Sequence, residues 1–439
     1  AIQEGGHSDI DSEVVLDKKL LIGSIVELNK LLEQSPELLQ QIKDSNLPDG
    51  LDLVSGGPPC QSFSMAGLRQ LSNERNSLPW EFAKFVDLTR PKFVILENVS
   101  GILRAFSTEK GQFYAWYEVS KAFVKIGYVP LCLHVNAKYA GVAQNRPRFI
   151  LLGIRIDVYE KIISKLNIKE KEALTHSFEF FKKVQVCPDL EYGHLNYFDV
   201  DKNTDFFEQS FLKPLVKFKG REFTVQDAIQ DLSTTSTQTK SMYVNTLDSL
   251  FNPLLTAHDS LSNNVLRTNG IHVRKRFKLY QNLNLVSQAT KKEVQQILKG
   301  NIDFISDTAF DELRPLSFLN EDDQIIHFDK CDEFLEYLKV HQTKKQTQKA
   351  LIPNKPAPAA LSIPDDACHY IDLRTLTVRE MARIQSFPDN FKFLSKVTTG
   401  GQMRKFEVPQ YTQVGNAVPP LLGFALGQSL KYLIDIYKS

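Results

Sequence analysis

Short, almost continuously apolar runs alternate with helix-like segments over the first third of the chain, and this alternation limits the fold more than any other feature. The runs lie at 51–55, 93–96, 129–135 and 149–153, and apolar residues at helical spacing lie at 27–43, 80–88 and 112–126. Strands without alternating polar residues are buried on both faces, as in a parallel sheet covered by helices. We therefore predict an α/β fold with a largely parallel sheet.

The rest of the chain has a different character. A length of 439 residues predicts two or three domains at about 150 residues each. From about 157 to 372 the sequence is rich in Lys, Asn, Gln, Ser and Thr, its apolar periodicity is weak, and it ends in a proline-spaced linker. We predict an α/β lobe at 1–156, a separate irregular domain at 157–372, and a segment at 373–439 that returns to the lobe. Helical patterns at 377–385 and 419–437 lie in that last segment.

The composition excludes several classes of protein. The 53 Lys+Arg and 52 Asp+Glu leave a net charge of +1, which argues against an overall basic coat and leaves room for a local basic groove. No apolar run approaches the ~18 residues of a membrane helix, and the N-terminal sequence does not resemble a signal peptide. The 5 cysteines are widely spaced, which predicts free thiols in a reducing compartment and no metal site.

A thiol stands in a stiff loop directly after the first expected strand. The loop begins Gly56-Gly57-Pro58-Pro59-Cys60, in which the prolines fix φ and the glycines allow a ligand to approach the backbone. Ligands gather at the carboxyl ends of parallel strands, and a thiol there can act as a nucleophile if local charge lowers its pKa. We interpret Cys60 as a candidate nucleophile; an inert, buried cysteine is the alternative.

Three charged residues adjoin other expected strands. Glu97 follows the run at 93–96, and Arg146 and Arg148 precede the run at 149–153. In an extended chain the two guanidinium groups lie on one side, where they can clamp a phosphate or a carbonyl oxygen. Glu97 can present a hydrogen bond to a ring nitrogen if a closed site raises its pKa. The alternatives are an ion pair of Glu97 with an arginine and a surface salt-bridge ladder for the arginines.

Taken in order, these segments resemble the DNA (cytosine-5)-methyltransferases of bacterial restriction–modification systems. The matching segments are GGPPCQSFS (56–64), ENV (97–99), NAKYAGVAQNRPRF (136–149), TVREMARIQSFPD (377–389) and QVGNAVPP (413–420). The resemblance spans nearly the whole chain and is weakest in the domain at 157–372. One such motif can arise by chance, whereas this series in this order does not.

The resemblance implies a Rossmann-like sheet that binds S-adenosylmethionine, and double-stranded DNA as the substrate. Cys60 would add to C6 of a cytosine flipped out of the duplex. Glu97 would contact N3 and the exocyclic amine, Arg148 the carbonyl oxygen, and Arg146 would order the catalytic loop. C5 would take the methyl group of S-adenosylmethionine before β-elimination releases Cys60. The resemblance implies no metal, no membrane association, and a cytoplasmic enzyme that associates with the bacterial nucleoid.

The cofactor residues follow the family pattern only in part. By resemblance, Pro59 and Leu78 line the adenosine site and Asn416 completes it. The family's Gly-Asp-Ile segment reads Gly23-Ser24-Ile25 here, which puts the Ser24 hydroxyl in place of a carboxylate. The family's opening glycine-rich strand–turn–helix, and with it the first strand of the sheet, has no counterpart. Truncation, a companion polypeptide that supplies this part, and a degenerate relative are three explanations, of which the intact catalytic candidates favour the first two.

Within this interpretation, 1–156 is the catalytic lobe, 157–372 the target-recognition domain and 373–439 the returning segment. The basic run at 274–278 would contact phosphates, with a solvated face as the alternative, while Arg379, Glu380, Arg383 and Gln385 would brace the domain junction. A tRNA cytosine-5 methyltransferase is one alternative, although a large variable domain favours the DNA major groove. A catalytically incomplete specificity chain that needs a companion subunit is another. An enzyme of thymidylate-synthase type leaves the variable domain unexplained.

Overall fold

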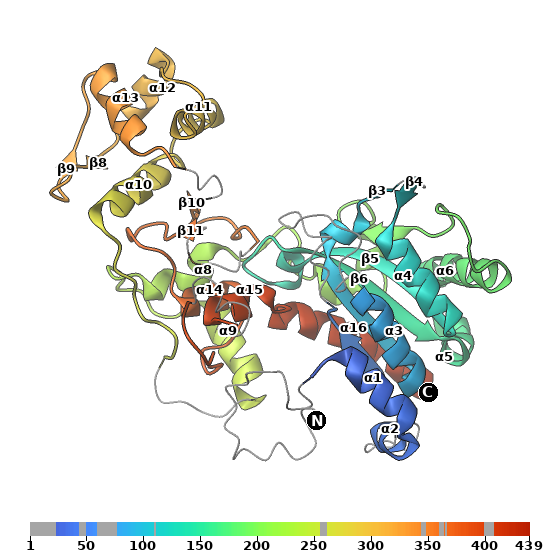
Figure 1. The fold of residues 1–439 in the computed structure, drawn as a ribbon. Helices are drawn as coiled ribbons and strands as arrows, with labels where there is room; N and C mark the ends of the chain where they lie inside the picture. The colour runs from blue at the N-terminus through green and yellow to red at the C-terminus, as the bar shows by residue number, and fades with distance from the viewer. Residues whose placement is uncertain are drawn as a thin grey trace. The chain divides into compact units, whose positions relative to one another are not determined.

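The computed structural model describes residues 23–43, 50–58, 77–108, 111–254, 261–343, 348–359, 364, 367–398 and 408–439, and Figure 1 shows its helices and strands. The chain divides into two compact units. Unit 1 comprises Ala1–Gly141, Arg146–Gly220 and Leu421–Ser439, and unit 2 comprises Val142–Asn145 and Arg221–Pro420. The segment 157–372 therefore contributes its first part to unit 1 and the remainder to unit 2.

Unit 1 is built on a five-stranded sheet in the order β1-β2-β6-β5-β7. β1 pairs with β2 and β5 with β7 in parallel, whereas β6 pairs antiparallel with both β2 and β5. The strands are β1 (Leu53–Gly56), β2 (Phe93–Val99), β5 (Tyr128–Asn136), β6 (Pro147–Arg155) and β7 (Tyr197–Asp199).

The sheet is mixed: β1, β2, β5 and β7 run in one direction, as the prediction of a largely parallel sheet has it, and β6 alone among these strands runs against them. β5 and β6 are joined by a short segment that holds only the 3-10 helix η4 (Ala137–Ala140). A parallel pair would need a long crossover connection, so this short link dictates antiparallel strands. The apolar run of β6 indicates that both faces of this strand are buried, but burial does not determine the direction in which a strand runs.

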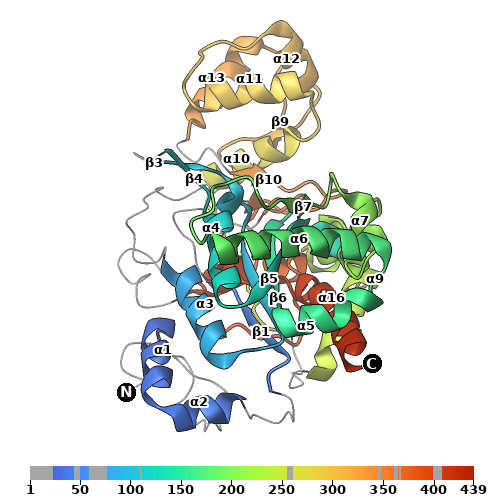
Figure 2. The same ribbon diagram turned by 90° about the vertical axis from the view of Figure 1, so that its right-hand side faces the viewer.

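Helices bury both faces of this sheet, which confirms the α/β prediction. α3 (Leu78–Thr89), α4 (Ala115–Lys125) and α6 (Ile168–Val186) lie over one face (Figure 2). Their side chains form one core with the strands, which includes Phe82, Trp116, Phe123, Leu151 and Phe180. Side chains on the opposite face of the sheet, such as Ile95, Leu133 and Ile150, are also buried.

The remaining elements of unit 1 are helices near the two ends of its sequence and short elements between them. The expected helix at 27–43 is two helices, α1 (Ile25–Gln34) and α2 (Pro36–Lys43), because Pro36 lacks the N–H that a continuous helix needs and disfavours a helical Ser35. α16 (Pro420–Lys438) confirms the helix expected at 419–437. The others are β3 (Phe106–Thr108), β4 (Gly111–Phe113), α5 (Ile156–Ile162) and α7 (Thr204–Glu208).

Unit 2 is mainly helical, more so than its weak apolar periodicity indicates. Its helices are short and several start at a serine whose side chain accepts a backbone N–H, a local signal that does not depend on apolar spacing. They are α8 (Val225–Ile229), α9 (Met242–Phe251), α10 (Ile271–Asn282), α11 (Gln288–Leu298), α12 (Asp307–Leu313), α13 (Cys331–Val340), α14 (Val378–Ile384) and α15 (Gln410–Asn416).

Two small sheets and a second core complete unit 2. β8 (Phe318–Leu319) pairs antiparallel with β9 (Ile325–Ile326), and β10 (Lys349–Ala350) pairs in parallel with β11 (Ala367–Cys368). A hydrophobic cluster joins α10, α11, α12 and α13 to these strands. Among the described parts of both units, no helix is long and apolar enough to cross a membrane.

Candidate active site

Polar residues gather at one edge of the sheet of unit 1. β1, β2 and β5 end at this edge and the antiparallel β6 begins there. Glu97 lies within β2, two residues before its end, so the expectation that it follows the strand is wrong. Pairing continues through Val99 and Arg148 on β6, which keeps the backbone extended past Glu97.

Glu97 and Arg148 form an ion pair across β2 and β6. Glu97 lies opposite Ile150 and Arg148 opposite Val99, so the two side chains are diagonal neighbours on the same face of the sheet. Arg148 Nε lies 2.6 Å from Glu97 Oε1, and their side chains are only 11% and 17% exposed. The sequence left open an ion pair or a hydrogen bond to a ring nitrogen for Glu97, and the structure contains the ion pair.

Arg146 adds a second buried guanidinium near this pair. Burial and the neighbouring charge of Arg148 lower the pKa of Arg146 to about 9, while the charge of Glu97 opposes this change. Burial also lowers the pKa of Arg148, again opposed by Glu97. Arg146 and Arg148 thus place two guanidinium groups near the carboxylate of Glu97, a combination that suits a polar, electron-rich ligand. Because Arg146 and Arg148 are buried, the alternative of a salt-bridge ladder on the surface is excluded.

The start of the GGPPC segment, at Gly57 and Pro58, runs directly beside Glu97 and Asn98. A Cβ on Gly57 would lie 3.2 Å from Glu97 Oε2, so a side chain at this position would press on the carboxylate. Asn98 donates a hydrogen bond from Nδ2 to the carbonyl oxygen of Pro58 at 3.1 Å. These contacts bring the start of the loop to the Glu97–Arg148 pair, whereas Pro59 and Cys60 lie outside the described residues.

Asn136 fixes the backbone at Arg146. Its Oδ1 accepts hydrogen bonds from the N–H of Arg146 at 3.1 Å and from that of Lys138. The N–H of Ala137 donates in turn to the carbonyl oxygen of Arg146. The sequence analysis placed Asn98 and Asn136 within motifs but gave neither residue a role. The signal that could have identified them is a polar side chain that lies inside a motif and next to a strand end.

The candidate cofactor residues fall in both units. Ser24 caps α1, where its Oγ accepts from the N–H of Val26, and Leu78 begins α3. Asn29 of α1 donates to both the main chain and the carboxylate of Glu81 on α3, so these two helices are linked. Asn416, exposed at the end of α15, belongs to unit 2.

The connection that carries Leu78 suits a nucleotide-like ligand. β1 and β2 are parallel neighbours, and α3 is the crossover between them. In α/β sheets such crossovers start at the edge where ligands bind. A Cβ on Gly56, at the end of β1, would lie 2.5 Å from the Phe82 ring, so only glycine lets α3 pack this closely. The assignment of Leu78 to an adenosine site stays a prediction, with this crossover starting at the edge where α/β sheets bind ligands.

A buried charge network holds the segment that carries Asn416. Gln385 donates from Nε2 to the carbonyl oxygen of Val414 at 2.7 Å, and Tyr411 donates to that of Leu376 at 2.6 Å. Arg383, on the buried helix α14, binds both carboxylate oxygens of Asp389 at 2.8 Å. These contacts assign Arg383 and Gln385 a structural role within unit 2.

In the part of the chain that the structure describes, no group of three or more His, Cys, Asp or Glu side chains is placed to hold an ion. The cysteines in those ranges, Cys132, Cys187, Cys331 and Cys368, are all free thiols.

Taken together, the covered mixed sheet and the polar cluster at the ends of its parallel strands define an α/β enzyme. The chain belongs to the C-5 cytosine-specific DNA methylase family, whose profile matches residues 27–432. This result confirms the resemblance found in the sequence. The protein is therefore an S-adenosylmethionine-dependent methyltransferase of the family that methylates cytosine in DNA.

Two type II methyltransferases agree with this assignment. The chain is 27% identical over 393 residues to the type II methyltransferase M.DdeI of Desulfomicrobium norvegicum, with 88% of this chain and 74% of the relative covered. It is 26% identical over 383 residues to the type II methyltransferase M1.HphI of Haemophilus parahaemolyticus, covering 87% and 68%. Among solved structures, S. pombe Dnmt2 methyltransferase is 12% identical with a TM-score of 0.38, covering 90% of this chain and 82% of that chain.

Proposed function

We propose that this chain methylates C5 of a cytosine flipped out of duplex DNA, through a covalent bond between Cys60 and C6. The observation that carries the proposal is the cluster of Glu97, Arg146 and Arg148 at the edge where the GGPPC segment leaves β1. It combines a hydrogen-bonding carboxylate with two buried guanidinium groups beside a motif that contains a thiol. The type II methyltransferases among the relatives support DNA as the substrate.

The first step is addition of the Cys60 thiolate to C6. The sulfur lone pair forms the S–C6 bond, and the electrons of the C5–C6 double bond move toward N3 and the carbonyl oxygen. Glu97 hydrogen-bonds N3 and the exocyclic amine, and Arg148 binds the carbonyl oxygen, so both stabilise this charge. Arg146, buried beside them, orders the loop and favours the anionic forms of the thiol and the adduct.

The second half of the reaction restores the ring. When bound, S-adenosylmethionine supplies the methyl group to C5. Loss of the C5 proton to a base and departure of the Cys60 thiolate from C6 then re-form the double bond. Leu78, Ser24, Pro59 and Asn416 would hold the cofactor.

The proposal also assigns the two functional parts of the chain. The α/β lobe provides the chemistry, and the domain at 157–372 recognises the DNA sequence. Extrusion of the base costs a few kcal/mol, which contacts in the pocket offset. A glycine-rich strand–turn–helix, from the same polypeptide or from a companion, would complete the cofactor site.

Transfer of a labelled methyl group from S-adenosylmethionine to mixed-sequence duplex DNA tests the activity. The chain is measured alone and with a peptide that carries the glycine-rich strand–turn–helix. Trapping on a duplex with 5-fluorocytosine, followed by peptide mapping, tests the nucleophile. We expect an adduct at Cys60, none in Cys60→Ser, and retained DNA binding in that variant. An adduct at another cysteine contradicts the assignment of the nucleophile.

A tRNA substrate and a binding-only chain are the competing functions, and the same assay separates them. Methylation of tRNA with none of duplex DNA would establish the first. Sequence-selective binding that Cys60→Ser leaves unchanged, with no transfer under any condition, would establish the second.

A further inference from the structure

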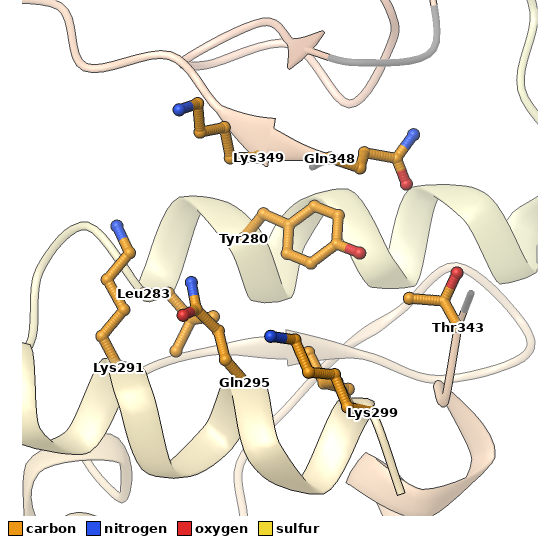
Figure 3. A pocket seen from close by; sticks show the side chains of 9 residues that line it. Tyr280, Leu283, Lys291, Gln295, Lys299, Thr343, Gln348 and Lys349 are labelled. Carbon is orange, nitrogen blue, oxygen red and sulfur yellow. The ribbon is translucent and has the colours of Figure 1, made fainter. Parts of the chain in front are cut away.

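Unit 2 contains a small pocket whose lining is basic. It lies between α10, α11 and β10 and has a volume of about 40 Å³. Figure 3 shows the amino groups of Lys291, Lys299 and Lys349 around it, together with polar groups of Tyr280 and Gln295. A space of this size admits an ion or a few waters rather than a base or a peptide side chain.

The positive charge of this pocket has no acidic partner in the described ranges. No carboxylate there lies within ion-pair distance of the three lysines; Lys291 donates to the amide oxygen of Asn284 instead. Burial, followed by the charges of Lys349 and Lys355, lowers the pKa of Lys291. Lys349 therefore repels Lys291, and an anion placed in the pocket beside them would relieve that repulsion.

The basic run on α10 differs in this respect. Arg274 forms an ion pair with Asp323, and the buried Lys275 forms one with Glu321. The first two cations of this run, which was predicted to contact phosphates, are therefore each paired with a carboxylate of the protein. Arg276 and Lys278 of the same run have no carboxylate within ion-pair distance among the described residues, so the run keeps part of its positive charge alongside the lysine pocket.

We propose that the lysine pocket binds a phosphate of the DNA backbone. This inference rests on the proposed function and names a part of unit 2 that holds the substrate. Lysine ammonium groups with amide and hydroxyl neighbours are suited to phosphate oxygens, and such contacts position a protein without reading its sequence.

The chain path connects this pocket to the residues that directly precede Arg146. Ala357 accepts a hydrogen bond from the N–H of Asn145, the residue before Arg146, and donates to the carbonyl oxygen of Ala143. Lys349 precedes Ala357 by eight residues, which span at most about 29 Å when extended. This length of chain is comparable with one turn of duplex, which is about 34 Å.

Salt-dependent DNA binding by the full chain tests the proposal. Lys291→Gln and Lys349→Gln should weaken binding equally for different sequences and reduce the slope of log K against log salt by about 1. Lys330→Gln is the matched control, since Lys330 is an exposed lysine paired with Glu333, and it should leave the slope unchanged. Unchanged slopes in the two pocket variants, with folding intact by thermal denaturation, would overturn the proposal.

A second experiment distinguishes DNA from free phosphate. Acylation of Lys291 by an amine reagent is followed by mass spectrometry with and without duplex DNA or pyrophosphate. Protection by DNA supports the proposal, and protection by pyrophosphate alone overturns it in favour of a free anion. If the wild-type chain transfers methyl groups to DNA but the pocket variants bind like wild type, this inference fails and the proposed function stands. If the wild-type chain does not bind DNA, both fail.

Discussion

Glu97 of β2 and Arg148 of β6 are joined at 2.6 Å as diagonal neighbours on one face of the antiparallel pair. Their positions depend on strand register rather than on a loop, so the pair is held rigidly. Arg146, two residues before Arg148 in the sequence, is almost completely buried. The carboxylate of Glu97 therefore lies next to two buried guanidinium groups.

Glu97→Gln tests this dependence while keeping the shape of the side chain. Loss of the carboxylate removes the group that binds N3 and leaves two buried cations without their shared anion. We expect the rate of methyl transfer to fall by about 10²- to 10⁴-fold with the fold retained, measured in single turnovers and by circular dichroism. Glu118→Gln is the control, because Glu118 pairs with Lys121 on α4, and its rate should match wild type. An unchanged rate in Glu97→Gln would contradict the assigned role.

Gly57→Ala tests the close passage of the loop beside Glu97. The added Cβ would lie 3.2 Å from Oε2 and displace the carboxylate by a few tenths of an ångström. Small displacements of a catalytic group are costly, so we expect kcat to fall about tenfold or more. Gly423→Ala serves as the control, since a Cβ there meets nothing within 4 Å and favours the helix. Equal kcat values in the two variants would show that the contact does not matter.

Much of unit 1 could be predicted because burial leaves a direct mark on the sequence. The runs at 93–96 and 149–153 became parts of β2 and β6. The same runs gave no strand direction, because both faces of each strand are covered whichever way it runs. Pro36 marked a helix break that the leucine spacing alone did not reveal.

The site was predictable as a set of residues but not as an arrangement. Glu97 and Arg148 are 51 positions apart, and only the register of β2 with β6 brings them together. The partners of Arg274 and Lys275 lie on a distant turn near β8 and β9, so the sequence showed a basic run where the structure has ion pairs. Pairings between residues so far apart in the chain leave no local pattern in the sequence from which they could be predicted.

Asp389→Ala tests the stability that the charge network gives unit 2. Arg383 binds Asp389 through two nitrogens, and Lys240 lies 2.7 Å from the same carboxylate. Removal of one partner from a buried pair typically costs about 3–5 kcal/mol, and we expect a loss of this size in the free energy of unfolding by urea. Asp435→Ala breaks the exposed pair with Lys431 and should cost less than about 1 kcal/mol. Similar losses would contradict a structural role for the network.

The same carboxylate predicts acid sensitivity. Burial alone would raise the pKa of Asp389, but the hydrogen bonds and charges of Arg383 and Lys240 outweigh it and hold the pKa below 3.8. A folded pKa below the unfolded value stabilises the fold above that unfolded value, and this stability is lost as the pH falls through the folded pKa. We expect urea stability to be flat near neutral pH and to fall below about pH 4. Asp389→Asn should show a shallower fall, and an identical pH profile would rule out this linkage.

Thiol alkylation offers a test of Cys60 that does not require turnover during labelling. Burial raises the pKa of Cys132 to about 12 and raises that of Cys368 as well, so both should react slowly at neutral pH. Cys187 is exposed and should react with iodoacetamide without loss of activity. We expect methyl transfer to decay at the rate at which mass spectrometry finds Cys60 modified. Cys187→Ser should decay at the same rate as wild type; protection in this variant would place the essential thiol at Cys187 and refute the assignment of Cys60.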